Sequence, residues 1–65
     1  MLEYKMKVNF DETRWFQVAV VNDAGVYKLE FKLNPNTLVV TLEERSKILA
    51  ATQTAIDAIQ RYISD

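Results

Sequence analysis

The chain has 65 residues, of which 49% are hydrophobic, and a formal net charge of −1 from 8 basic and 9 acidic side chains. It contains no Cys and no His, which excludes disulfides, thiolate or imidazole metal ligands, and catalytic triads that need those side chains. Its single Gly excludes a glycine-rich phosphate-binding loop. We therefore expect one globular domain over residues 1–65, not an enzyme, with no cofactor and no metal site.

The small size of the chain favours association. A domain of this length buries only about 60% of the surface that its unfolded chain exposes. Without a disulfide or a metal, the remaining means of stabilising so small a core is pairing with another chain. The apolar runs are short, and the start MLEYKMKV has no long apolar segment, so we expect no membrane segment, no secretory signal and a cytoplasmic location. Its size alone fits an accessory protein of a bacterium or phage.

The first predicted element is a strand over residues 2–10. Apolar and polar side chains alternate along it, and period two is typical of a half-buried strand. Its apolar face carries Leu2, Tyr4, Met6, Val8 and Phe10. The polar residues 11–13 then predict a turn.

Two more strands, over residues 14–21 and 26–33, are predicted on either side of the segment NDAG, Asn22 to Gly25. This segment has the chemistry of a tight turn with Gly25 at a positive φ. A hairpin that pairs Val21 with Val26 gathers the large apolar side chains of both strands on one face. A slip by one residue would expose them all, so we expect the register to be well specified.

A long helix over residues 42–64 is the last predicted element. Thr41 and Glu44 form the pattern of a capping box, and no Pro or Gly follows. Pro35 ends the third strand, and Thr37–Val40 is predicted as a short fourth strand or as an extended connection. The fold class is α+β: a three- or four-stranded antiparallel meander (residues 2–41) with one C-terminal helix (42–64) packed on one face.

Apolar side chains cover about half of the circumference of the predicted helix when they are placed at 100° steps. One part is expected to cover the sheet, namely Ile48, Leu49, Ile56, Ile59 and Ile63. The other part is expected to form a homodimer interface, because small side chains let two backbones approach closely. It consists of Ala51, Ala55, Ala58 and Tyr62. In the alternative interpretation, the alanines are only good helix formers at the rim of the sheet contact.

The outer face of the predicted sheet carries an aromatic side chain among lysines. We predict a partner-binding face made of Trp15, Gln17, Ala19, Lys5, Lys7, Lys28 and Lys32. Lysine stems that cover Trp15 would make this an ordinary surface. A Trp within a polar rim is also typical of a protein-binding hot spot, and bases of single-stranded nucleic acid could stack on it.

These features favour a small homo-oligomeric interaction protein, an adaptor, inhibitor or regulatory subunit that acts by binding another protein. The alternative is single-stranded nucleic-acid binding through Trp15 and the lysines, and the acidic balance of the chain argues against it. A third hypothesis is a small ligand bound between two protomers.

Overall fold

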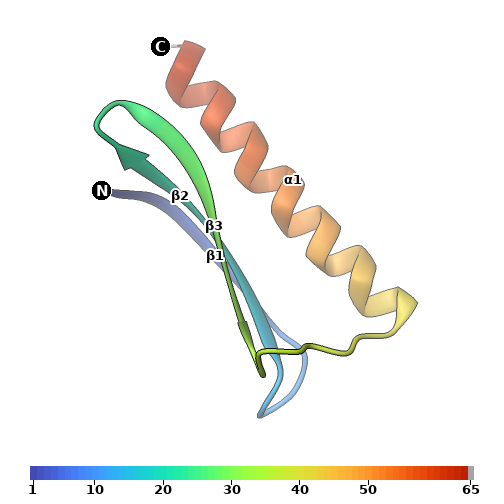
Figure 1. Ribbon diagram of the computed structural model, residues 1–65. Helices are drawn as coiled ribbons and strands as arrows, with labels where there is room; N and C mark the ends of the chain where they lie inside the picture. Colours follow the sequence, from blue (N-terminus) through green and yellow to red (C-terminus); the bar gives the residue numbers. More distant parts are fainter. Residues whose placement is uncertain (65) are drawn as a thin grey trace.

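The computed structural model describes residues 1–64. They form one antiparallel sheet with the strand order β1-β2-β3 and one helix packed on it (Figure 1). The elements are β1 (Leu2–Asn9), β2 (Trp15–Asp23), β3 (Val26–Asn34) and α1 (Leu42–Ser64). The predicted α+β meander with a C-terminal helix is confirmed.

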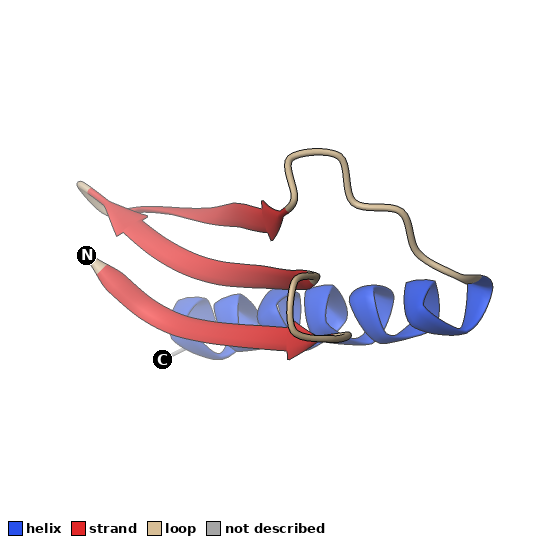
Figure 2. Ribbon diagram, turned by 90° about the horizontal axis from the view of Figure 1, so that it is seen from below, coloured by secondary structure: helices blue, strands red, loops and turns tan. Residues whose placement is uncertain are grey.

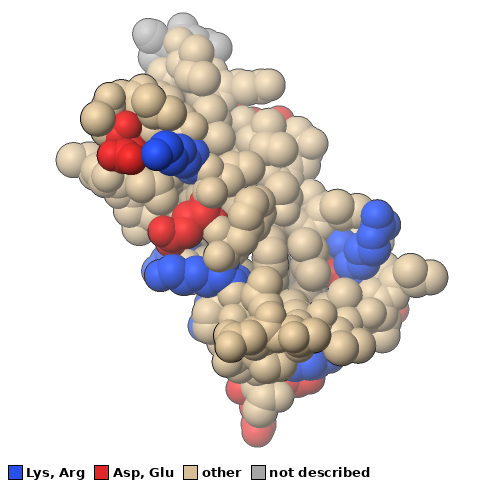
Figure 3. Space-filling model, viewed as in Figure 1, with Lys and Arg blue, Asp and Glu red and all other residues tan. Residues whose placement is uncertain are grey.

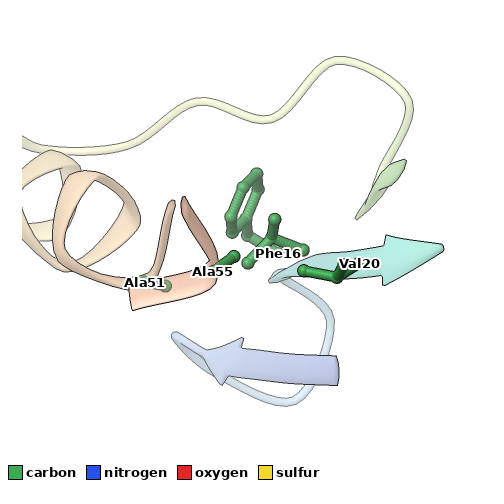
Figure 4. Packing of buried hydrophobic residues seen from close by; sticks show 5 residues of the cluster. Phe16, Val20, Ala51 and Ala55 are labelled. Carbon is green, nitrogen blue, oxygen red and sulfur yellow. The ribbon is translucent and has the colours of Figure 1, made fainter. Parts of the chain in front are cut away.

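The core lies between the central strand β2 and the middle of α1. Val18 and Val20 are the largest side chains with no exposed surface, and Phe16 lies beside them (Figure 4). Ala51 and Ala55 close this cluster from the helix side. Because the two alanines contribute only methyl groups, the helix can lie close to the large side chains of β2.

The helix lies over β1 and β2 and leaves β3 largely uncovered. Its contacts with the sheet are concentrated on the first two strands, and Figure 2 shows β3 lying away from the helix. At the C-terminal end, Tyr62 stacks on Tyr27 of β3 with ring centroids 5.7 Å apart. The Tyr62 hydroxyl donates to the carbonyl of Glu3 in β1 (3.1 Å). Tyr62 therefore ties the end of α1 to both edge strands.

The hairpin between β2 and β3 has a shorter loop than predicted. Asp23 pairs with Val26, and Val20 pairs with Leu29, so the predicted pairing of Val21 with Val26 is wrong by two positions. The loop residues Ala24 and Gly25 both have positive φ, 53° and 89°. A two-residue loop of this kind matches the twist of the flanking strands. A shift of two positions keeps every side chain on its predicted face.

The loop residue Ala24 provides a test of this turn. Because a side chain other than Asn or Asp is disfavoured at positive φ, we expect Ala24→Asn to raise the free energy of unfolding by about 0.5–1 kcal/mol. Chemical denaturation would measure the change. Ala24→Val is the matched control and should lower it, because a β-branched side chain fits this conformation worse. If residue 24 had negative φ, as in a four-residue loop, Ala would be unstrained there and Ala24→Asn would bring no such gain.

Residues 35–41 connect β3 to α1 without forming a fourth strand, so of the two predictions for Thr37–Val40 the extended connection is confirmed and the short strand is not. The carbonyl of Val39 accepts a hydrogen bond from Arg14 Nη1 (2.7 Å). This bond takes the place of a backbone hydrogen bond to a neighbouring strand. The side chain of Leu38 packs against the core. The segment is therefore held as an extended connection by one partly buried side chain and one arginine.

The predicted capping box at the start of α1 is confirmed. The Glu44 N–H donates to Thr41 Oγ1 (3.1 Å), and the Thr41 N–H donates to Glu44 Oε1 (2.9 Å). Arg14 also binds both Glu44 oxygens, at 3.1 and 2.8 Å, and its Nε donates to Asp11 Oδ2 (2.7 Å). One guanidinium thus joins the β1–β2 turn, the connection and the first helical turn.

These ion pairs shift the acidity of their members. The hydrogen bond from Arg14, followed by that from the Thr13 N–H, lowers the pKa of Asp11 from 3.8 to about 2. Arg14, followed by the Thr41 N–H, also lowers the pKa of Glu44 below its ordinary value of 4.5. Both carboxylates in turn raise the pKa of Arg14. The cluster is therefore fully charged at neutral pH.

The cluster predicts a loss of stability in acid. A carboxylate whose pKa is lower in the folded state stabilises that state above its unfolded pKa. This contribution should therefore be intact above about pH 4.5 and decline as the pH falls towards 2. Urea unfolding at a series of pH values would measure the decline. We expect Arg14→Gln to flatten it and the exposed Arg45→Gln to leave it unchanged; equal slopes in both variants would contradict the assignment.

Candidate interaction surface

The structure corrects the predicted assignment of the helix faces. Ala51, Ala55 and Ala58 are buried against the sheet of their own protomer, and Tyr62 is engaged with Tyr27. These four residues are therefore not free to form a contact between helices as predicted. Of the stripe expected to cover the sheet, Ile48 and Ile59 do pack against the core. Leu49 and Ile63 do not, since half or more of each side chain is exposed.

The physical reason for this arrangement is the size of the side chains on the sheet. The inner faces of β1 and β2 carry large side chains that fill the space between the layers: Tyr4, Met6, Val8, Phe16, Val18 and Val20. Protein interiors are packed to a nearly constant density. A helix can therefore approach such a surface only if small side chains lie at the centre of the contact. The larger isoleucines therefore lie at the margins of the contact.

The predicted outer face exists, but its side chains are largely engaged within the protomer. The ammonium group of Lys7 lies 4.5 Å from the ring centroid of Trp15, which is within cation–π range. Lys28 Nζ lies 2.9 Å from Asp23 Oδ2, and Lys32 Nζ lies 3.7 Å from Glu30 Oε1. This arrangement supports the interpretation of Trp15 as a covered surface residue. It gives no specific support to nucleic-acid binding.

The other predicted members of the outer face differ in accessibility. Ala19 is 1% exposed and lies between Lys5 and Glu30 on the neighbouring strands, so it offers no contact area to a partner. Gln17 lies between Lys7 and Lys32 and is partly exposed. The structure therefore brings the predicted residues onto one face without forming an apolar surface there.

A second surface has the apolar character that the outer face lacks. We call it the open flank and define it by Phe31 and Leu33 of β3 and by Leu49, Ile56 and Ile63 of α1. Phe31 is 49% exposed, Leu49 50% and Ile63 67%. Helix α1 runs in the same general direction as β2 (Figure 1), so side chains about 100° ahead of Ala55 point towards the β3 side. Figure 3 looks onto this side, where uncharged side chains dominate and charged ones form small separate groups.

The dimensions of the protomer agree with an incompletely covered core. Its accessible surface is 4709 Å², whereas a compact monomer of 7.5 kDa has about 4,250 Å². Its radius of gyration is 12.7 Å, against about 10.7 Å for a compact domain of this length. The protomer therefore exposes more surface than its mass requires.

The sequence reasoning missed the open flank because it assigned its members to the core. Phe31 and Leu33 alternate correctly with charged residues, and Leu49 and Ile63 follow helical spacing. Hydrophobicity alone could not separate them from covered residues. The available signal was volume: a helix centred on three alanines covers less of a sheet than one centred on isoleucines.

No group of three acidic side chains is placed to hold a metal ion within residues 1–64. Over the same residues, the helix is not long and apolar enough to cross a membrane.

Comparison of the chain with family models, curated proteins and solved structures gave no match.

Proposed function

We propose that the protein is a homo-oligomeric interaction protein, an adaptor, inhibitor or regulatory subunit, and that the open flank is the surface through which its chains associate. The observation that carries this proposal is the exposure of Phe31, Leu49 and Ile63 on one side of the molecule. Contiguous apolar side chains at a surface are typical of interaction sites.

Binding rather than catalysis is proposed because of the residues available. The chain has no His or Cys, and the acidic residues with lowered pKa, Asp11 and Glu44, are both held by Arg14 in a structural cluster. Their environment stabilises the ionised form, which makes each a poor proton donor at neutral pH. Burial of the open flank would add the hydrophobic contact that a domain of this size lacks.

The solution mass tests the proposal. We expect light scattering after size exclusion, at micromolar protein, to give a dimer or a larger assembly. The double substitution Leu49→Lys and Ile63→Lys should yield a folded single chain, because both positions lie outside the core. The matched control is Ala50→Lys with Gln53→Lys, on the exposed side of the same helix, and should keep the wild-type mass. A wild-type chain that stays monomeric at the highest soluble concentration would overturn the proposal.

A further inference from the structure

The exposed edge of β3 is a candidate site for pairing between two copies of the chain. We propose that β3 pairs with β3 of a second copy, antiparallel and centred on Phe31, so that two sheets join into one of six strands. This inference rests on the proposed function and specifies its geometry. It follows from three features: the backbone groups that β3 leaves open, the order of its charges, and the contrast with the edge of β1.

The backbone of β3 presents its free groups at the residues of the inner face. In a two-residue hairpin the closing pair, here Asp23 and Val26, is hydrogen-bonded, and such pairs alternate along the ladder. Lys28, Glu30 and Lys32 therefore direct their backbone groups to β2. The N–H and C=O groups that point away from β2 belong to Tyr27, Leu29, Phe31 and Leu33. An edge of this length with free groups is a template for another strand.

The opposite edge of the sheet is blunted. The register of β1 shifts between Leu2 and Tyr4, and such an irregularity disfavours pairing with another strand. The carbonyl of Glu3 in this region is already taken by the Tyr62 hydroxyl. The fold thus protects the Leu2–Tyr4 end of β1 against pairing with another strand. Among the described residues, the edge of β3 has no such protection.

The charges of β3 select the register. Its outer face reads Lys28, Glu30, Lys32. Antiparallel pairing centred on Glu30 would place the two Glu30 side chains opposite each other and Lys28 opposite Lys32, and like charges directly opposite are destabilising. Pairing centred on an inner residue, one position away, instead places Glu30 opposite a lysine on both sides of the two-fold axis.

Two inner residues could occupy the centre, Leu29 and Phe31. Centring on Leu29 would leave Leu33 opposite Gly25, outside the strand, and therefore uncovered. Centring on Phe31 pairs the two Phe31 side chains and places Leu33 opposite Leu29, so that Phe31 and Leu33, the exposed apolar residues of the inner face, are covered by the second copy. Lys28 then faces Asn34 and keeps its ion pair with Asp23. The register centred on Phe31 is therefore preferred.

In this register Glu30 faces Lys32 of the second copy at a position where the ladder hydrogen bonds are absent. Side chains approach most closely at such positions. The two-fold axis stands perpendicular to the joined sheet, so both helices lie on the same face. The helix members of each open flank then point towards the joined β3 strands, which connects the edge pairing with the apolar surface already described.

Charge substitutions test the register. Lys32→Glu turns two attractive pairs into repulsive ones and should raise the dissociation constant of the dimer roughly tenfold. Glu30→Lys should do the same. The double variant Glu30→Lys with Lys32→Glu restores opposite charges across the axis and should recover the wild-type constant. Lys28→Glu is the matched control, because Lys28 faces Asn34 and its loss should change the constant little. Sedimentation over a range of concentrations measures each value.

Each result has a distinct meaning. A monomeric wild type overturns both the proposed function and this inference. An oligomer that is lost on Leu49→Lys with Ile63→Lys, but unchanged by Lys32→Glu and Glu30→Lys, leaves the proposed function standing and overturns the strand pairing. Weakening by Lys28→Glu, without rescue in the double variant, overturns the register centred on Phe31. Amide exchange provides a second measurement: the N–H of Phe31 should become protected as the dimer forms, and unchanged exchange would contradict the pairing.

Discussion

Ala55→Glu is expected to unfold the protomer. Ala55 has no exposed surface and closes the cluster around Phe16, Val18 and Val20. A glutamate there must bury a carboxylate without a partner or displace the helix, and either costs several kcal/mol. A domain of this size has a total free energy of unfolding of only about 3–10 kcal/mol. Circular dichroism should therefore show loss of both helix and cooperative melting.

The neighbouring position supplies the control for this experiment. Ala50 is exposed on the same helix, and Ala50→Glu should change the free energy of unfolding by no more than about 0.5 kcal/mol. A folded, monomeric Ala55→Glu protein would mean that the alanines face a second copy, as the sequence had suggested. The experiment therefore separates the two assignments of the helix faces.

The sequence predicts most of the fold because its local signals agree with one another. Alternation over residues 2–10 and 26–33 marks two strands, and the reciprocal pair Thr41 and Glu44 marks the start of α1. The register of the hairpin was harder to predict. Asn22 suits the start of a four-residue loop, and its side chain does accept the Gly25 N–H (2.8 Å). The strands nevertheless continue to Asp23 and Val26, because both loop residues adopt positive φ.

The candidate surface could be predicted only in part. The outer face with Trp15 follows from strand alternation, and its location is correct. Whether Trp15 is covered depends on the conformation of one lysine side chain, which no sequence pattern specifies. The open flank depends on where a helix lies across a sheet, and this is decided by side-chain volumes on both layers. A stripe of alanines is therefore compatible with burial against the sheet and with contact to a second chain, until the side chains around it are placed.

The two phenylalanines of the inner face should respond differently to truncation. Phe16 is buried on β2, and its ring centroid lies 5.9 Å from that of Phe31 on β3. Phe16→Ala leaves a cavity in the core and should cost about 3–5 kcal/mol at any protein concentration. Phe16→Leu should cost about 1–2 kcal/mol and keep the transition measurable. Urea unfolding of dilute protein gives these values.

Phe31→Ala is the informative comparison, because about half of its side chain is in water in the single chain. In dilute solution the loss should be less than half of that for Phe16→Ala, since less apolar surface returns to solvent. At higher concentration the wild type gains stability by association, and a chain that associates less well gains less. The deficit of Phe31→Ala should therefore grow with concentration while that of Phe16→Ala does not. Equal deficits in dilute solution would mean that the protomer itself covers β3, and the open flank would then not exist.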